Sequence, residues 1–254
     1  LFALLVSFQS LKLSETNNRL LYQTSNPGYG KALILSIFLI IFFGSRDPNS
    51  IFFADTMGYA SRYNIIKEFG KNSVWYSIIS SQSSEIIWSK ILLLFAQAKL
   101  GVSIWFTFIS CVYILSILFS LKNFFPNHIF LSTVFAFLNF GFYGGAINGI
   151  RSGMALSLIL LALSLIIGKQ RKLIGAFILM LIAFEIHTSV VLPIICILVS
   201  IYFIKKPKLS IVIWSISILG SLFLGNFFTS FFSSLGFDDR LSSYMDYGQE
   251  LSTM

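Results

Sequence analysis

Three ionisable side chains in the most apolar part of the chain are the first candidates for chemistry. Arg151 begins the apolar run RSGMALSLILLALSLII, and Glu185 and His187 end the next apolar run, in FEIHTS. Ionisable groups are costly in hydrocarbon, so those found there indicate a functional site. Arginine can bind a phosphate or carboxylate through its bidentate fork, or it can merely anchor a helix end. Histidine can act as a general base near neutral pH, or it can be an interior residue held by hydrogen bonds.

The spacing of these residues limits which of them could act together. On a continuous helix Glu185 and His187 would point about 200° apart, so they could face one substrate only if the backbone turns there. Asn148 lies three residues before Arg151, and the helical three-and-four rule places both on one face. The sequence therefore predicts that Asn148 lies beside Arg151.

A glycine recurs every fourth residue around the start of the Arg151 helix. On a single helix this spacing predicts a smooth ridge that lets another backbone approach closely. The ridge could serve packing alone, or it could also hold Arg151 rigidly. The four positions are Gly141, Gly145, Gly149 and Gly153.

A second group of polar and aromatic residues precedes this region. Asp55, Tyr59 and Tyr63 are four residues apart, so a helix would place a carboxylate and two rings on one face. Such a face suits a sugar, because rings stack on its apolar side and the acid binds its hydroxyls. The alternative is an aromatic belt at the membrane surface.

No motif for a soluble nucleotide-dependent or metal-dependent enzyme is present in the sequence. It has no Walker or Rossmann glycine loop, no zincin motif and no G-x-S-x-G. Cys111 and Cys196 lie in apolar segments and favour small buried residues over a disulfide or a metal site. The net charge of +8 comes from short basic clusters between apolar runs, which is no nucleic-acid signature. We expect no metal, no cofactor and no nucleic-acid partner.

The composition establishes the class of protein. The chain has 254 residues, of which 56% are hydrophobic and 11% charged, whereas about 25% are charged in soluble domains. The apolar runs are continuous rather than alternating, which favours helices over a barrel. We therefore expect an all-α, polytopic transmembrane helix bundle, with re-entrant or interfacial helices in its outer loop. We expect residues 1–254 to form one membrane domain. A start at Leu1 without methionine indicates a fragment of a longer chain, or a gene with an unusual start.

The apolar runs predict where the chain crosses the bilayer. A mixed region from Ser45 to Lys90 forms the outer loop, and the run Ile91–Ala98 is too short to be a clear span. The run Leu173–Ile204 is too long for one crossing, and we expect His187 and Pro193 to interrupt it. The other predicted spans are Ala32–Gly44, Gly101–Leu121, Ile129–Tyr143, Ile147–Ile167 and Leu209–Phe228.

The basic residues predict the orientation of these spans. The positive-inside rule places the loop 10–31, Lys122 and the turns GKQRK and KKPK on the inner side, provided that 91–98 does not cross. Arg151 and His187 then fall on the outer side, as do Asp55, Tyr59 and Glu185. Groups from separate segments could thus share one pocket.

An ordered set of short motifs along the chain resembles the EpsG family of bacterial membrane proteins, which are related in role to Wzy-type O-antigen and capsule polymerases. The motifs are Arg46, DTMGY with Asp55 and Tyr59, Glu85 before an apolar run, RSGMALSL from Arg151, and FEIHTSVV with His187. The usual glycine–threonine before the aspartate is Phe53–Ala54 here. Family chains are longer, so the resemblance also implies a missing C-terminal part.

The resemblance implies assembly of surface polysaccharide at the outer face of the bacterial inner (cytoplasmic) membrane. The reaction would transfer a growing glycan from undecaprenyl diphosphate to a hydroxyl of the next lipid-linked oligosaccharide. Other polysaccharide-assembly proteins would be its partners, together with the lipid bilayer. A membrane O-acyltransferase, a transporter of the lipid-linked unit and a structural subunit of the same pathway stay open as alternatives.

The resemblance also gives the candidate residues their roles. Arg151, with Arg46, would bind the diphosphate, because a cation can stabilise this leaving group without a metal. His187 or Asp55 would act as the base or position the acceptor. Tyr59 and Tyr63 would contact the sugar. The remaining candidate substrate-binding residues are Glu85, Glu185 and Asn148.

Overall fold

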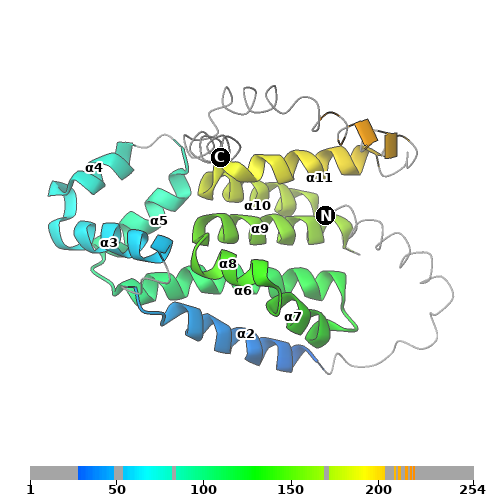
Figure 1. The fold of residues 1–254 in the computed structure, drawn as a ribbon, viewed down its shortest axis with the longest axis horizontal. Coiled ribbons are helices and arrows are strands. Elements are labelled where there is room, and N and C mark those ends of the chain that lie inside the picture. Colours follow the sequence, from blue (N-terminus) through cyan, green and yellow to red (C-terminus); the bar gives the residue numbers. More distant parts are fainter. Residues whose placement is uncertain are drawn as a thin grey trace, which may run out of the picture.

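The structure is a computed structural model that describes residues 28–48, 54–81, 84–168 and 172–203, with single positions between 209 and 220. Every regular element in these ranges is helical, which confirms the all-α fold for the part of the chain described (Figure 1). The elements are α2 (Tyr29–Gly44), α3 (Ala54–Phe69), η1 (Gly70–Asn72), α4 (Val74–Ser81), α5 (Ile86–Gln97), α6 (Val102–Phe124), α7 (Ile129–Phe137), α8 (Phe140–Ile147), α9 (Ile150–Ile167), α10 (Leu173–Ile186), η2 (Thr188–Val190) and α11 (Val191–Phe203).

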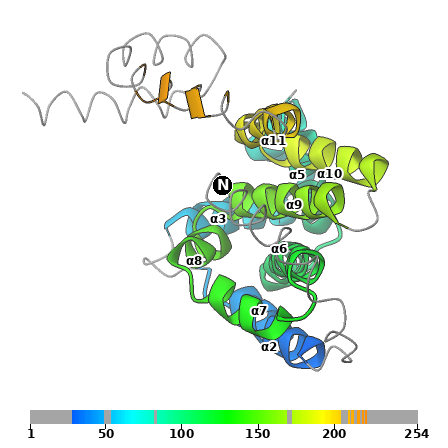
Figure 2. The ribbon, with the colours of Figure 1, turned by 90° about the vertical axis from the view of Figure 1, so that its right-hand side faces the viewer.

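Two central helices are long and apolar enough to cross a membrane. Helix α6 has 23 residues and α9 has 18, which correspond to about 34 Å and 27 Å at 1.5 Å per residue. Helix α2 packs on α6, α6 on α9, and α9 on α10. Figures 1 and 2 show these helices side by side, and Figure 1 shows α3, α4 and α5 gathered beyond one end of them. The predicted spans Gly101–Leu121 and Ile147–Ile167 therefore correspond to α6 and α9.

The helices before α9 differ from the prediction, both in the expected span Ile129–Tyr143 and at the start of the expected span Ile147–Ile167. The expected span Ile129–Tyr143 is instead the bent pair α7 and α8, which meet at 68° and are a broken span or a re-entrant loop. The bend follows from Asn139, whose side-chain oxygen accepts a hydrogen bond of 2.7 Å from the Gly141 amide and so begins a new helix. Helix α9 accordingly begins at Ile150, not at Ile147.

The four regularly spaced glycines do not form a ridge on one helix, so that prediction is wrong. The chain reverses between α8 and α9, and Gly145 on α8 lies directly against Gly153 on α9. A Cβ atom added to Gly153 would lie 2.8 Å from the Gly145 Cα and would overlap its carbonyl group. The two backbones are thus in contact, and this contact fixes where α9 begins.

The long apolar run 173–204 is interrupted at His187, as predicted. Helix α10 ends at Ile186, His187 is extended with φ −156°, and α11 begins at Val191. Pro193 does not interrupt the run. It lies in the first turn of α11, where its missing N–H removes no intrahelical hydrogen bond.

The short run Ile91–Ala98 belongs to α5, which has 12 residues. This helix is about 18 Å long, shorter than the roughly 30 Å hydrocarbon core. It packs against α3 and α10. The expectation of a non-spanning helix in this region agrees with that length.

Some predictions fall outside the described residues. These are most of the span Leu209–Phe228, the turn KKPK, the loop before Gly28, the tail after Gly220 and most of the turn GKQRK. Among the described helices, the apolar α2 and α10 are shorter than 18 residues.

The backbone contact between α8 and α9 generates a matched pair of substitutions. We expect Gly153→Ala to lower the free energy of unfolding by about 1–3 kcal/mol, because overpacking forces the two backbones apart. Gly144→Ala is the control, since a Cβ atom there meets nothing within 4 Å, and it should stabilise α8 by about 0.5–1 kcal/mol. Thermal unfolding of the purified proteins in detergent measures both. Equal effects of the two substitutions would contradict the contact.

Candidate functional site

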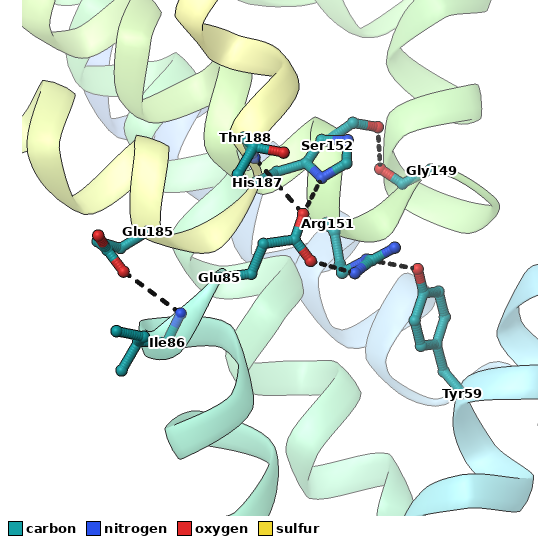
Figure 3. A network of polar contacts seen from close by, with 9 residues as sticks. All are labelled: Tyr59, Glu85, Ile86, Gly149, Arg151, Ser152, Glu185, His187 and Thr188. Carbon is teal, nitrogen blue, oxygen red and sulfur yellow. Dashed lines mark hydrogen bonds and ion pairs between the residues drawn. The ribbon is translucent and has the colours of Figure 1, made fainter. Parts of the chain in front are cut away.

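The carboxylate of Glu85 is the centre of a polar network at one end of the helix bundle (Figure 3). Its Oε2 forms an ion pair with Nη1 of Arg151. Its Oε1 lies 2.6 Å from Nδ1 of His187 and accepts a longer hydrogen bond, of 3.4 Å, from the Thr188 amide. The Glu85 side chain is only 8% exposed. One buried carboxylate therefore joins α5, α9 and the break after α10.

Arg151 is held from a second side by Tyr59. The Arg151 Nε donates a hydrogen bond of 2.8 Å to the Tyr59 hydroxyl, and the guanidinium lies 5.7 Å from the centre of that ring. The Tyr59 ring packs edge-on against Trp88 of α5. Helix α3 thus completes the site, and Arg151 is fixed by both a charge and a hydroxyl group.

Local structure explains why Arg151 needs a negative partner. It is the second residue of α9, in the first turn after the N-cap Gly149. The positive end of the helix dipole disfavours a cation there and favours an anion. The Glu85 carboxylate offsets this unfavourable placement, so the pair is stable where Arg151 alone would not be.

His187 reaches the network because the backbone leaves α10 at that residue. Its extended conformation directs the ring to Glu85, while its amide still donates to the Ala183 carbonyl. Glu185, two residues earlier, accepts a hydrogen bond of 3.3 Å from the Ile86 amide. The two side chains therefore act on neighbouring parts of α5, which the turn at His187 makes feasible.

Opposing effects set the charge of Glu85. Burial raises the pKa of its carboxyl group. The opposing effects are together larger and lower this pKa; they are the hydrogen bond to His187, the charges of Arg151 and His187, and the Thr188 amide. The resulting pKa lies below the ordinary value, so Glu85 is ionised at neutral pH. Within the described residues, no three His, Cys, Asp or Glu side chains are grouped so that they could hold a metal.

Arg46 lies outside this network and joins two helix ends. Its Nη1 donates to the Phe43 carbonyl at 3.2 Å and to the Ala146 carbonyl at 2.8 Å, at the C-terminal ends of α2 and α8. Its guanidinium lies 4.2 Å from the centre of the Phe106 ring, and burial lowers the pKa of Arg46 to about 10. The cation is thus favourably placed at two negative helix ends.

Three other candidate residues are not part of the network either. Tyr63 is fully buried, stacks on Trp105 and donates to the Leu100 carbonyl, so a sugar cannot reach its ring. Asn148 caps the end of α8 and is not on a face of α9 with Arg151, because the chain turns between them. Asp55 is exposed in the first turn of α3.

The sequence reasoning missed Thr56, which is fully buried and donates a hydrogen bond of 2.6 Å to the Ile147 carbonyl. Arg46 and Thr56 together satisfy carbonyl groups at the end of α8, immediately before α9 and Arg151. The signal in the sequence was the spacing of Thr56, Ala60 and Tyr63, which form the buried face of α3.

One known protein family matches almost the whole chain. The EpsG family model matches residues 31–253. The chain belongs to the EpsG family. The match includes all four side chains of the network, and EpsG membership makes this chain a membrane protein of a polysaccharide-biosynthesis family. No curated protein and no solved structure matches the chain.

The lowered pKa of Glu85 predicts how the stability of this EpsG protein depends on pH. A carboxylate with a depressed pKa contributes stability that is fully present above the ordinary value, 4.5, and is lost as the pH falls through the folded-state value. Glu85→Gln removes the counter-charge of Arg151 and should cost about 3 kcal/mol or more at neutral pH. The difference in unfolding free energy from wild type should shrink in acid.

Thermal unfolding of both proteins from neutral to acid pH checks this prediction. Glu68→Gln is the matched control, because it removes a carboxylate from the exposed side of α3. Parallel pH curves for wild type and Glu85→Gln would contradict an ionised, buried Glu85.

Proposed function

We propose that this EpsG protein is a polysaccharide polymerase. It would transfer a glycan from a lipid diphosphate to the next lipid-linked repeat unit at the outer face of the bacterial inner membrane. One observation carries the proposal: an arginine and a histidine from separate helices meet on a shared carboxylate at one end of the bundle. Family membership supports the substrate class.

Arg151 is the group that would stabilise the leaving diphosphate. Its guanidinium has five N–H donors, and Tyr59 and Glu85 accept from Nε and Nη1. No described residue accepts from Nη2, so this nitrogen is available for a phosphate oxygen. A preorganised cation aimed at developing negative charge is the largest single contribution in many enzymes. Its side chain is 17% exposed, which gives a ligand access.

His187 is the group that would take the proton of the acceptor. With Nδ1 held by Glu85, Nε2 is the nitrogen without a partner among the described residues. In the proposed step the acceptor hydroxyl oxygen bonds to the anomeric carbon and the bond from that carbon to the diphosphate breaks. The hydroxyl proton moves to His187 Nε2, and the electron pair leaves with the diphosphate.

Residues of α3 would contact the sugar. Tyr59 presents a partly exposed ring and hydroxyl beside Arg151. Asp55 lies one helical turn earlier with an exposed side chain, and its carboxylate would bind acceptor hydroxyls. We propose that Arg46 holds two helix ends together and does not bind the diphosphate, because its hydrogen bonds go to carbonyl groups at those ends.

Substitutions in a deletion strain test this function. We expect Arg151→Ala and His187→Ala to abolish long glycan chains while single-repeat material is retained, as seen on gels of surface polysaccharide. Loss of a positioned base typically lowers the rate about 10²–10⁴-fold, and loss of a charge-stabilising donor about 10²–10³-fold.

Matched controls are available on the same chain. Arg62→Ala removes an arginine that stacks on Trp75 of the outer helices, and His128→Ala removes the exposed N-cap of α7. Both should leave chain length normal. Normal polymer in Arg151→Ala at wild-type protein level would refute the polymerase role. Normal chain length without acetyl groups in the deletion strain would indicate an acyltransferase, and repeat units retained on the inner leaflet a transporter.

A further inference from the structure

Both oxygens of the Glu85 carboxylate are already engaged within the protein. Oε1 faces His187 Nδ1 and the Thr188 amide, and Oε2 faces Arg151. The side chain is 8% exposed. A substrate hydroxyl therefore finds little of this carboxylate to bind, although the sequence motif alone favoured Glu85 as a substrate-binding residue.

We propose that Glu85 is a positioning residue that fixes His187 as the tautomer with its proton on Nδ1 and holds Arg151 beside it. An ionised carboxylate has no proton to donate, so the hydrogen bond requires that Nδ1 carry the hydrogen. The lone pair of the neutral ring is then on Nε2. The part of this inference that concerns catalysis rests on the proposed function, whereas the tautomer follows from the contact of Nδ1 with an ionised Glu85.

The backbone of Glu85 supports this assignment. Its φ of 56° and ψ of 42° are left-handed, and among the described non-glycine residues only Lys99 shares a positive φ. Such strain persists where the surrounding structure imposes it, often at functional sites. The conformation turns the carboxylate away from α5, for which it makes no capping hydrogen bond, and towards α9 and His187.

Glu185 has the complementary task. An N-cap side chain normally accepts from the second or third amide of its helix, and the Glu85 side chain makes no such bond. Glu185 instead accepts from the first amide of α5, that of Ile86 (Figure 3). One glutamate therefore caps α5, and this frees the other glutamate to orient the histidine and the arginine.

The tautomer can be measured directly, because the chain contains two histidines. His128→Asn leaves His187 as the sole histidine, and ¹⁵N-histidine labelling in lipid nanodiscs then reports which ring nitrogen carries the proton. The spectra are recorded at a pH at which the ring is neutral. We expect Nδ1 to be protonated in most molecules. A ring protonated mainly on Nε2 would overturn the proposal without any further variant.

Variants at Glu85 separate its two interactions. Glu85→Gln retains an oxygen that can accept from Nδ1, so the tautomer should persist while the polymer shortens because Arg151 loses its charge partner. Glu85→Ala removes the acceptor, and the protonated Nδ1 should no longer dominate. Glu68→Gln should change neither signal nor polymer. An Nδ1 population unchanged in Glu85→Ala would overturn the proposal.

The spectroscopic result is independent of the polymerase assay. If the polymer tests fail but Nδ1 is protonated and responds to Glu85→Ala, the positioning role stands and the proposed reaction falls. If His187 proves essential for polymer but its proton is on Nε2, the polymerase function stands, but Glu85 does not set the tautomer and Nε2 is not the nitrogen that takes the acceptor proton.

Discussion

The site depends on one buried carboxylate that two basic side chains share. Glu85, Arg151 and His187 come from α5, α9 and the end of α10, and each is largely withdrawn from solvent. A buried charge is strongly destabilising without its partner, whereas the paired network offsets much of the cost of desolvation. The three segments must therefore meet for any one of these residues to be tolerated, and the fold of this end of the bundle is coupled to the site.

The rest of the bundle determines where the carboxylate finds its partners. Helix α9 begins, and α10 ends, at the end of the bundle where α3 and α5 gather, because the chain reverses direction between them (Figure 1). The Gly145–Gly153 contact fixes the turn before α9. Arg46 and Thr56 satisfy the carbonyl groups at the end of α8, which holds the start of α9 and hence Arg151 in place.

Local sequence patterns predicted the apolar helices and the costly groups within them. Arg151 and His187 stood out because ionisable residues are rare in such runs, and the break at His187 followed from the excessive length of 173–204. These patterns could not predict that Arg151 and His187 pair with Glu85, because the two residues lie 66 and 102 positions from Glu85 in the sequence. Tyr63 was wrongly predicted to contact a sugar. The four-residue spacing shows that it shares a helix face with Tyr59, but not that another helix covers its ring. The four-residue spacing of the glycines is compatible with a ridge on one helix and equally with a contact between two helices.

The interaction between Glu85 and Arg151 is the central claim, and a double-mutant cycle measures it most directly. The free energy of unfolding is determined for wild type, Glu85→Gln, Arg151→Gln and the double variant in the same detergent. Residues in contact give coupling energies of about 0.5–3 kcal/mol, and the structure predicts a value in this range that stabilises the pair. Effects that add to within about 0.3 kcal/mol, as for distant sites, would contradict the shared carboxylate.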